Sequence, residues 1–248
     1  MNKTLTRIIV LISFILTFNT IVHAEQETQT ERQKITRITE LLQQNPQMID
    51  DFLNSLNYYI EQDQQIKETL LKHQNWLQNN ASQSSFGAAE PALTLINFSD
   101  YNCPYCKRLD PVLTALAAEI PELKVVNVFV PLRQKNPAGL DTNSAEFALN
   151  VWNNDPQSYQ QLHDYLMQKS GLHTAASLQK AARLSGTENL LSADTASRTI
   201  LQKNYQIFLE LGLKGTPAMI INNQIIPGYM PLDKLKPIVE QALAEINK

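Results

Sequence analysis

Residues 98–106 read Phe98-Ser99-Asp100-Tyr101-Asn102-Cys103-Pro104-Tyr105-Cys106. The apolar run that begins at Leu93 and ends at Phe98 predicts a short buried strand, and a helical pattern follows the second cysteine to about Ile120. The two cysteines therefore lie where a strand leads into a helix.

Cys103 and Cys106 are the only cysteines in the 248-residue chain. A disulfide that closes so short a loop adds little stability, and a zinc site needs further Cys or His ligands at metal-binding spacing, which the chain lacks. A C-x-x-C at a strand-to-helix junction is typical of a redox-active pair. We therefore predict a redox disulfide between Cys103 and Cys106, with no metal and no organic cofactor, because the sulfur pair itself carries the electrons.

The two sulfurs have different predicted roles. Cys103, at the start of the helix, meets unpaired backbone N–H groups and the positive end of the helix dipole, which favour the thiolate. It is the predicted nucleophile and the more exposed sulfur, and Cys106 is placed to resolve a mixed disulfide. Pro104 suits the first helical turn, and Tyr105 adds an aromatic wall.

The chain on either side of this segment predicts an α/β domain over residues 91–248. A branched run from Leu123 to Val130 predicts a second buried strand. Residues 141–213 show repeated helical patterns and are expected to form a helical insertion, in which His163 and His173 face solvent or cap helices. Two further strands, 218–221 and 224–226, are joined by a hairpin turn, and a final helix covers 231–246.

Residues 25–78 predict a helical arm, with one helix at 33–43 and a second from Asn45-Pro46 to residue 78. The second helix carries an apolar stripe made of Ile49, Phe52, Leu56, Tyr59, Ile66, Leu70 and Leu77. The arm is too narrow to bury this stripe, so we expect it to form a homodimer or homotrimer through residues 33–78. The alternative is that it folds back on its own domain. Residues 79–90, small and polar, predict a linker.

The amino terminus predicts export. Residues 1–24 combine two positive charges, an apolar stretch from Ile8 to Val22 and small residues before Glu25, as in a secretory signal peptide. An uncleaved membrane anchor is the alternative. The net charge of −3 leaves no basic stretch to neutralise phosphates, so nucleic acid is excluded as an expected partner.

The segment 98–106 resembles the active-site segment of the DsbA-like and DsbC-like periplasmic branch of the thioredoxin superfamily. Residues 215–218, Gly215-Thr216-Pro217-Ala218, are similar to the cis-proline loop of that superfamily. The resemblance implies a thioredoxin fold, a cis Thr216-Pro217 bond and a substrate-binding face that includes Pro104, Tyr105, Thr216 and Pro217. An ordinary trans proline is the alternative. One position departs from the pattern, because Asn97 stands where many relatives carry a buried acid.

The resemblance implies a periplasmic thiol-disulfide oxidoreductase that acts on exported cysteine-containing client proteins and is recycled by a membrane redox partner. The arm favours an isomerase, with oxidase activity alongside, because related proteins joined by such a region shuffle or reduce disulfides. Two alternatives use the same fold. One is a Cu(I)-binding metal-tolerance protein, in which the two thiolates hold the metal. The other is a noncatalytic surface protein.

Overall fold

The computed structural model describes residues 30–133 and 136–246, so the predicted signal peptide at 1–24 lies outside the described residues. The chain divides into two compact units, the first ending at Gln62 and the second beginning at Asp63. Across the described ranges, none of the helices is long and apolar enough to span a membrane.

The described part of the first unit is entirely helical apart from one junction. Residues 30–44 form one helix, and a 3-10 turn, η1 (Pro46–Met48), leads into α2 (Ile49–Asn79). The two helices and the Asn45-Pro46 junction were predicted. Large apolar side chains of this unit are exposed: Ile35, Ile38, Leu41, Met48, Ile49, Phe52, Leu53, Leu56, Tyr58, Tyr59 and Ile60.

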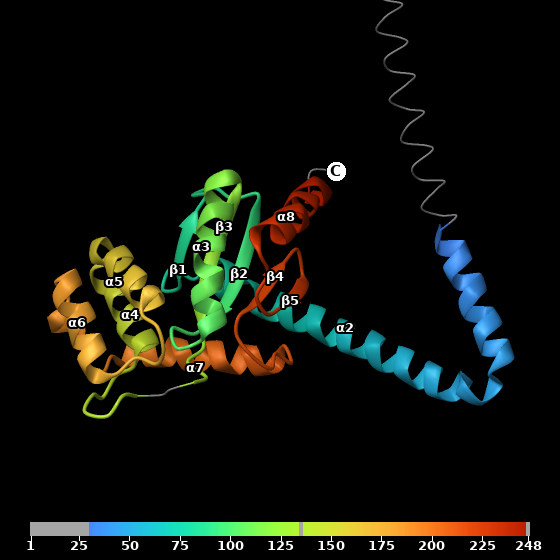
Figure 1. The fold of residues 1–248 in the computed structure, drawn as a ribbon, viewed down its shortest axis with the longest axis horizontal. Coiled ribbons are helices and arrows are strands. Elements are labelled where there is room, and N and C mark those ends of the chain that lie inside the picture. Colours follow the sequence, from blue (N-terminus) through green and yellow to red (C-terminus); the bar gives the residue numbers. More distant parts are fainter. Residues whose placement is uncertain (1–29, 134–135, 247–248) are drawn as a thin grey trace, which may run out of the picture. The chain divides into compact units, whose positions relative to one another are not determined.

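The second unit is built on a mixed five-stranded sheet in the order β1-β3-β2-β4-β5 (Figure 1). The strands are β1 (Ser84–Gly87), β2 (Leu93–Ser99), β3 (Leu123–Phe129), β4 (Ala218–Ile221) and β5 (Gln224–Pro227). β2 and β3 run parallel, and every other neighbouring pair is antiparallel. The four strands predicted from apolar runs are all present.

Helices cover both faces of this sheet (Figure 1). Because side chains alternate across a strand, Leu95 and Val125 pack with α3 (Pro104–Glu119) and α8 (Leu232–Ile246) on one face. Ile96 and Val126 pack on the other face, against the part of α2 from Asp63 on and against α7 (Thr195–Glu210). This is the α/β arrangement expected of a thioredoxin fold.

A helical subdomain is inserted between β3 and β4, as predicted for residues 141–213. It contains α4 (Ser144–Asn154), α5 (Pro156–Gln168), α6 (Ala175–Ser185), the 3-10 turn η2 (Glu188–Leu190) and α7. Its core includes Phe147, Leu162 and Leu178, and also Tyr101 and Phe129 from the sheet side. The insertion therefore packs directly against the loop that precedes the cysteines.

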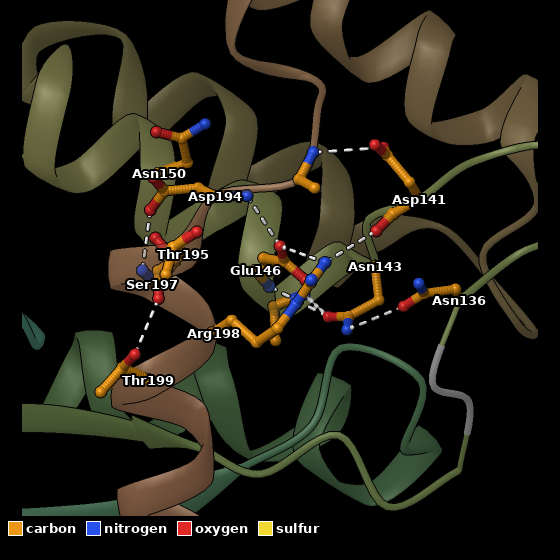
Figure 2. Close-up of polar contacts among 12 residues, drawn as sticks. Asn136, Asp141, Asn143, Glu146, Asn150, Asp194, Thr195, Ser197, Arg198 and Thr199 are labelled. Carbon is orange, nitrogen blue, oxygen red and sulfur yellow. Dashed lines mark hydrogen bonds and ion pairs between the residues drawn. The ribbon is translucent and has the colours of Figure 1, made fainter.

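Polar contacts join the starts of α4 and α7 (Figure 2). Asn143 caps α4 by accepting the N–H groups of residues 145 and 146, and Asp194 caps α7 by accepting that of Ser197. The buried Glu146 accepts the N–H of Asp194 and pairs with Arg198 at 3.0 Å. Two helix caps and an ion pair between the buried Glu146 and the exposed Arg198 thus fix the base of the insertion.

Residues 79–90 do not form the predicted linker. Ser84–Gly87 is a strand paired with β3, and Gln83 exchanges side-chain hydrogen bonds with Asn204 of α7. Gly87 has a φ of +93°, and a Cβ there would lie 2.3 Å from the carbonyl oxygen of Leu123. The small polar residues that indicated a linker instead allow close pairing at the sheet edge.

The predicted arm also ends earlier than residue 78. Leu70 and Leu77 are buried against the sheet, with Ile66 packed beside them. On the same stretch of α2, His73 Nε2 lies 2.7 Å from Glu210 Oε2 of α7. Residues 63–79 therefore belong to the second unit, so the stripe folds back on its own domain over this half.

Candidate functional site

The two cysteines lie at the beginning of α3. Cys103 is the N-cap residue, with extended backbone angles, and Pro104 occupies the first helical position, where its missing N–H costs nothing. Both cysteines are free thiols, and both are buried, Cys103 at 4% exposure and Cys106 at 1%. Cys103 is the more exposed of the two, as predicted, but only by a small margin, because Thr216 of the neighbouring loop lies against it.

Hydrogen bonding and burial together separate the two sulfurs. The pKa of Cys103 is lowered to about 5, chiefly by the hydrogen bond from the Cys106 thiol and also by the N–H groups of Cys106 and Tyr105 and the Thr216 side chain, against the effect of burial. The pKa of Cys106 is raised, first by burial and then by the adjacent Cys103. At neutral pH, Cys103 is therefore the thiolate and Cys106 the thiol.

The cis-proline loop lies against the cysteines. The Thr216-Pro217 bond is cis, as the resemblance implied. The Cys103 sulfur lies 3.1 Å from the carbonyl oxygen of Thr216, so two residues 113 positions apart in the chain meet at the site. The carbonyl of Pro217 accepts the N–H of Gly228, 2.9 Å away, which ties this loop to the end of β5.

The four predicted substrate-binding residues lie at different depths. Pro104 and Tyr105 are exposed, Thr216 is half-buried and Pro217 is buried. The Pro217 ring therefore shapes the loop, and Thr216 is the part of the loop that lies beside the sulfur. On the same side, the Arg108 guanidinium lies 4.6 Å from the Tyr229 ring centroid and 5.7 Å from that of Tyr105.

The turn before Cys103 is held by Asp100. This residue is fully buried, and its carboxylate accepts the N–H of Asn102 at 2.8 Å and that of Arg133 at 3.0 Å. Its backbone carbonyl accepts the N–H of Cys103 at 2.9 Å. Burial raises the pKa of Asp100, and these backbone N–H groups oppose the shift. The Asp-x-Asn spacing is the sequence signal for such a side-chain-capped turn, and sequence analysis did not use it.

Both insertion histidines are buried, so the prediction that they face solvent was wrong. The predicted alternative, a capping role, holds for His173, whose ring bonds a carbonyl in the last turn of α5. His163 Nδ1 lies 2.7 Å from the Tyr101 hydroxyl, and His163 Nε2 lies 2.9 Å from Asp110 Oδ1 on α3. The Tyr159 hydroxyl joins the same group and donates to Ser84 of β1 at 2.7 Å. This network connects the cysteine loop, the cysteine helix, the insertion and the sheet edge through side chains that no local pattern links.

His173 anchors the insertion to the residue before Cys103. Its backbone N–H donates to Asn102 Oδ1 at 2.7 Å, and its Nε2 lies 3.0 Å from the carbonyl oxygen of Leu166. Burial lowers the pKa of His173 to about 4, so the ring is neutral at neutral pH and donates to that carbonyl. His173 thus has a structural role at the site.

Asn97 lies on the face of the sheet that α3 covers. It is buried, and its Nδ2 donates to Asn127 Oδ1 of β3 at 2.9 Å. The Asn97 side-chain oxygen, Oδ1, has no hydrogen-bond partner among the described residues. The departure from a buried acid is therefore a cross-strand amide pair, which cannot accept a proton as a carboxylate does.

Solved structures and a curated relative resemble this chain. A linker-deleted variant of Proteus mirabilis ScsC matches with a TM-score of 0.69 and 30% identity, over 87% of this chain and 95% of that one. The catalytic domain of the same protein matches at 0.66 and 34%, over 71% and 98%. A periplasmic thioredoxin-like protein from Salmonella enterica serovar Typhimurium matches at 0.63 and 37%, over 69% and 95%.

The curated relative is disulfide bond formation protein D of Bacillus subtilis, which is 25% identical over 65% of this chain and 77% of its own length. The model of the DSBA-like thioredoxin domain matches residues 94–240, a range that contains both cysteines and the cis-proline loop. This range is more than half of the chain. The protein therefore belongs to the DSBA-like thioredoxin domain family of thiol-disulfide oxidoreductases.

Proposed function

We propose that this protein is a periplasmic disulfide isomerase, with oxidase activity alongside, that acts on exported proteins through Cys103 and Cys106. The observation that carries the proposal is the difference between the two sulfurs. The pKa of Cys103 is lowered to about 5 while that of Cys106 is raised. Cys103 is thus a nucleophilic thiolate, and Cys106 remains a thiol until it resolves a mixed disulfide.

Isomerisation uses the reduced pair. The Cys103 thiolate attacks one sulfur of a client disulfide, so the client S–S bond breaks, a Cys103–client disulfide forms and one client thiolate is released. A different client thiolate then attacks the client sulfur of the mixed disulfide. A new client disulfide forms and the Cys103 thiolate returns, so no electrons are gained or lost overall.

Cys106 releases a client that remains attached to Cys103 as a mixed disulfide. Cys106 loses its proton to solvent and attacks the Cys103 sulfur, which releases the client as a thiolate and leaves the Cys103–Cys106 disulfide. The client is then reduced by two electrons and the pair oxidised by two. The reverse sequence transfers the disulfide to a reduced client, and a membrane thiol-disulfide partner restores the starting state.

The exposed arm supports a role in which active sites are tethered. Phe52 and Leu56 are 38% and 44% exposed. They belong to an apolar stripe that no other part of the first unit covers among the described residues. The likeness to ScsC reaches beyond the catalytic domain of that protein. A homodimer or homotrimer through residues 33–62 covers the stripe and places several Cys103 thiolates around one client, which raises their effective concentration.

A trapping experiment tests the chemistry. Cys106→Ala in the full chain removes the resolving thiol, so a disulfide-linked adduct with scrambled ribonuclease is expected to accumulate on a non-reducing gel. Cys103→Ala is the matched control, and it forms no adduct. Copper(I) binding by the wild type without any adduct in Cys106→Ala would instead support the metal-tolerance alternative.

A second measurement separates isomerase from oxidase. Wild type and a Phe52→Glu/Leu56→Glu variant are compared for reactivation of scrambled ribonuclease and for oxidation of reduced ribonuclease. The arm variant is expected to lose most of the reactivation and to keep the oxidation. If the wild type oxidises but does not reactivate, the protein is an oxidase and the isomerase proposal fails.

A further inference from the structure

A hollow of about 460 Å³ lies against the residues that flank the reactive cysteine. Its walls are Asn102, Pro104, Lys107, Arg133, Gly171 and Leu172. Asn102 and Pro104 flank Cys103 in the chain, Lys107 is on the next turn of α3, and the last two residues belong to the loop between α5 and α6. Any group held in this hollow therefore lies against the two residues that flank Cys103.

The charged side chains that line the hollow are both cations. No carboxylate is among its described lining residues. The nearest acid in the turn, Asp100, is fully buried, and its oxygens already accept the N–H groups of Asn102 and Arg133. The walls of the hollow therefore offer two cations and no acid at the surface, and the buried Asp100 below them offsets part of their charge.

Lys107 is held in place by the insertion. Its Nζ donates to the carbonyl oxygens of Lys169 and Gly171, the second at 2.9 Å. An ammonium group carries three N–H bonds, so one remains for a ligand. Lys107 forms no ion pair with a carboxylate among the described residues. Because two backbone carbonyls already hold its Nζ, little side-chain freedom is lost when a ligand binds.

Arg133 supplies a second donor in the lining of the hollow. Its backbone N–H is used by Asp100, whereas its exposed guanidinium donates no hydrogen bond to any residue in the described ranges. Guanidinium groups match the geometry of a carboxylate through two parallel hydrogen bonds. Pro104 and Leu172 are exposed and apolar, so the same hollow also offers contact to a short aliphatic stem.

We infer that this hollow receives an acidic side chain of the client, Asp or Glu, close in sequence to the client cysteine that reacts with Cys103. The inference rests on the proposed function, because it takes the client sulfur at Cys103 as given. Because Asn102 and Pro104 line the hollow together with Lys107 and Arg133, a client segment whose cysteine reacts with Cys103 brings its neighbouring side chains close to these two cations. Cysteines flanked by acids are then preferred substrates.

The test uses short peptides in which one cysteine is joined by a disulfide to a chromogenic aryl thiol. Members of the set carry Glu, Gln or Lys at one of the two positions on either side of the cysteine. When the Cys103 thiolate of the reduced full-length protein attacks the peptide sulfur, the peptide–aryl disulfide breaks and the aryl thiolate leaves. Its absorbance gives the rate constant. The same peptides reacted with 2-mercaptoethanol give the intrinsic reactivity of each disulfide.

Each rate constant is divided by that of the same peptide with 2-mercaptoethanol. At one or more of the peptide positions, the Glu peptide is expected to react roughly threefold to tenfold faster than the Gln peptide at low salt, and the ratio is lower at high salt. Arg133→Gln and Lys107→Gln each bring the ratio towards one. Arg133→Gln leaves the contacts of α3 with the insertion intact, so it reports on the ligand even if Lys107→Gln loosens that loop. Arg183→Gln, which removes one exposed cation from α6, is the charge-matched control and keeps the ratio.

The possible failures differ from one another. If every peptide reacts fast and the Glu-to-Gln ratio is one at all positions, the hollow does not select acids, and the proposed function stands. If no peptide reacts faster than with 2-mercaptoethanol, the proposed function fails and the inference with it. If Arg133→Gln slows all peptides equally and shifts the pH profile of Cys103 alkylation, Arg133 acts on the thiolate and the inference is overturned.

Discussion

The two halves of α2 carry one continuous apolar stripe but have different surroundings. In the first half, Phe52 and Leu56 are 38% and 44% exposed, whereas in the second half Leu70 and Leu77 are 6% and 1% exposed. In both halves, the apolar residues of the stripe follow the same helical periodicity. The difference arises because the second half lies on a sheet face whose apolar side chains, such as Ile96 and Ile220, match it.

This comparison shows what an amphipathic pattern can predict. Periodicity identifies the side of a helix that avoids water, but it does not identify the surface that covers that side. Polar side chains add to the docking of the second half, since Trp76 Nε1 donates to Asn204 at 2.9 Å and His73 meets Glu210. The stripe of the first half is exposed, and self-association is our proposal for what covers it.

The largest effect is expected from charges in the first half. Phe52→Glu/Leu56→Glu places two carboxylates on the exposed stripe and removes roughly 3 to 6 kcal/mol of burial per chain from an oligomer interface. Sedimentation is expected to show an oligomer for the wild type and a monomer for the variant. A wild type that sediments as a monomer at all concentrations would contradict self-association.

A large but different effect is expected from the second half. Leu77→Ala removes a side chain that is fully packed between α2 and the sheet, and it is expected to lower the free energy of unfolding by about 2–4 kcal/mol. Denaturant unfolding followed by tryptophan fluorescence measures this, because both tryptophans, Trp76 and Trp152, lie in the second unit. Leu56→Ala is the matched control on the same stripe and is expected to change this transition by less than about 0.5 kcal/mol.

A smaller effect concerns the polar contact that holds the second half. The pKa of Glu210 is lowered from 4.5 to about 2, first by His73 and then by Lys72. Because the folded-state value lies below the unfolded one, this stabilisation is present above about pH 4.5 and is lost as the pH falls towards 2.

Glu210→Gln is therefore expected to be less stable than wild type by about 1 kcal/mol at neutral pH, with the gap closing in acid. Urea unfolding at a series of pH values measures the gap. Glu188→Gln, on the exposed turn η2, is the control, and a gap of equal size at pH 7 and pH 2 would show that the contact does not depend on the charge of Glu210.

The smallest effect is the one that the arm variant is expected to have on the titration of Cys103. Alkylation of Cys103 with a neutral haloacetamide is expected to titrate with a midpoint near pH 5, well below that of an unperturbed thiol. The Phe52→Glu/Leu56→Glu variant is expected to give the same midpoint, because the groups that stabilise the thiolate all come from α3 and the cis-proline loop. A midpoint that moves with the arm variant would mean that the first unit acts on the site.

Much of the candidate site could be predicted from local sequence. The C-x-x-C pair at a strand-to-helix junction located Cys103 and Cys106, and the Gly-Thr-Pro-Ala stretch identified the loop that lies against them. His163 could not be identified in this way. Its partners, Tyr101 and Asp110, lie 62 and 53 positions away, and they meet it only because α5 packs against both the cysteine loop and α3.

The misread linker has a similar cause. Small polar residues such as Ser84 and Ser85 occur both in linkers and at sheet edges where another backbone approaches closely. Composition alone does not separate the two cases. The deciding contacts come from Tyr159, which donates to Ser84 from a helix 75 positions away, and from the carbonyl of Leu123, which leaves no room for a Cβ at residue 87.

By itself, the sequence determined four of the five strands, the redox pair, the cis-proline motif and the amphipathic character of α2, since each depends on residues within a few positions of one another. Tertiary structure alone decided where the stripe of α2 is covered, how Thr216 closes over Cys103 and which cations line the hollow beside it. These features depend on contacts between distant segments, which local propensity and periodicity do not encode. Burial, and with it the pKa of each sulfur, follows from those contacts.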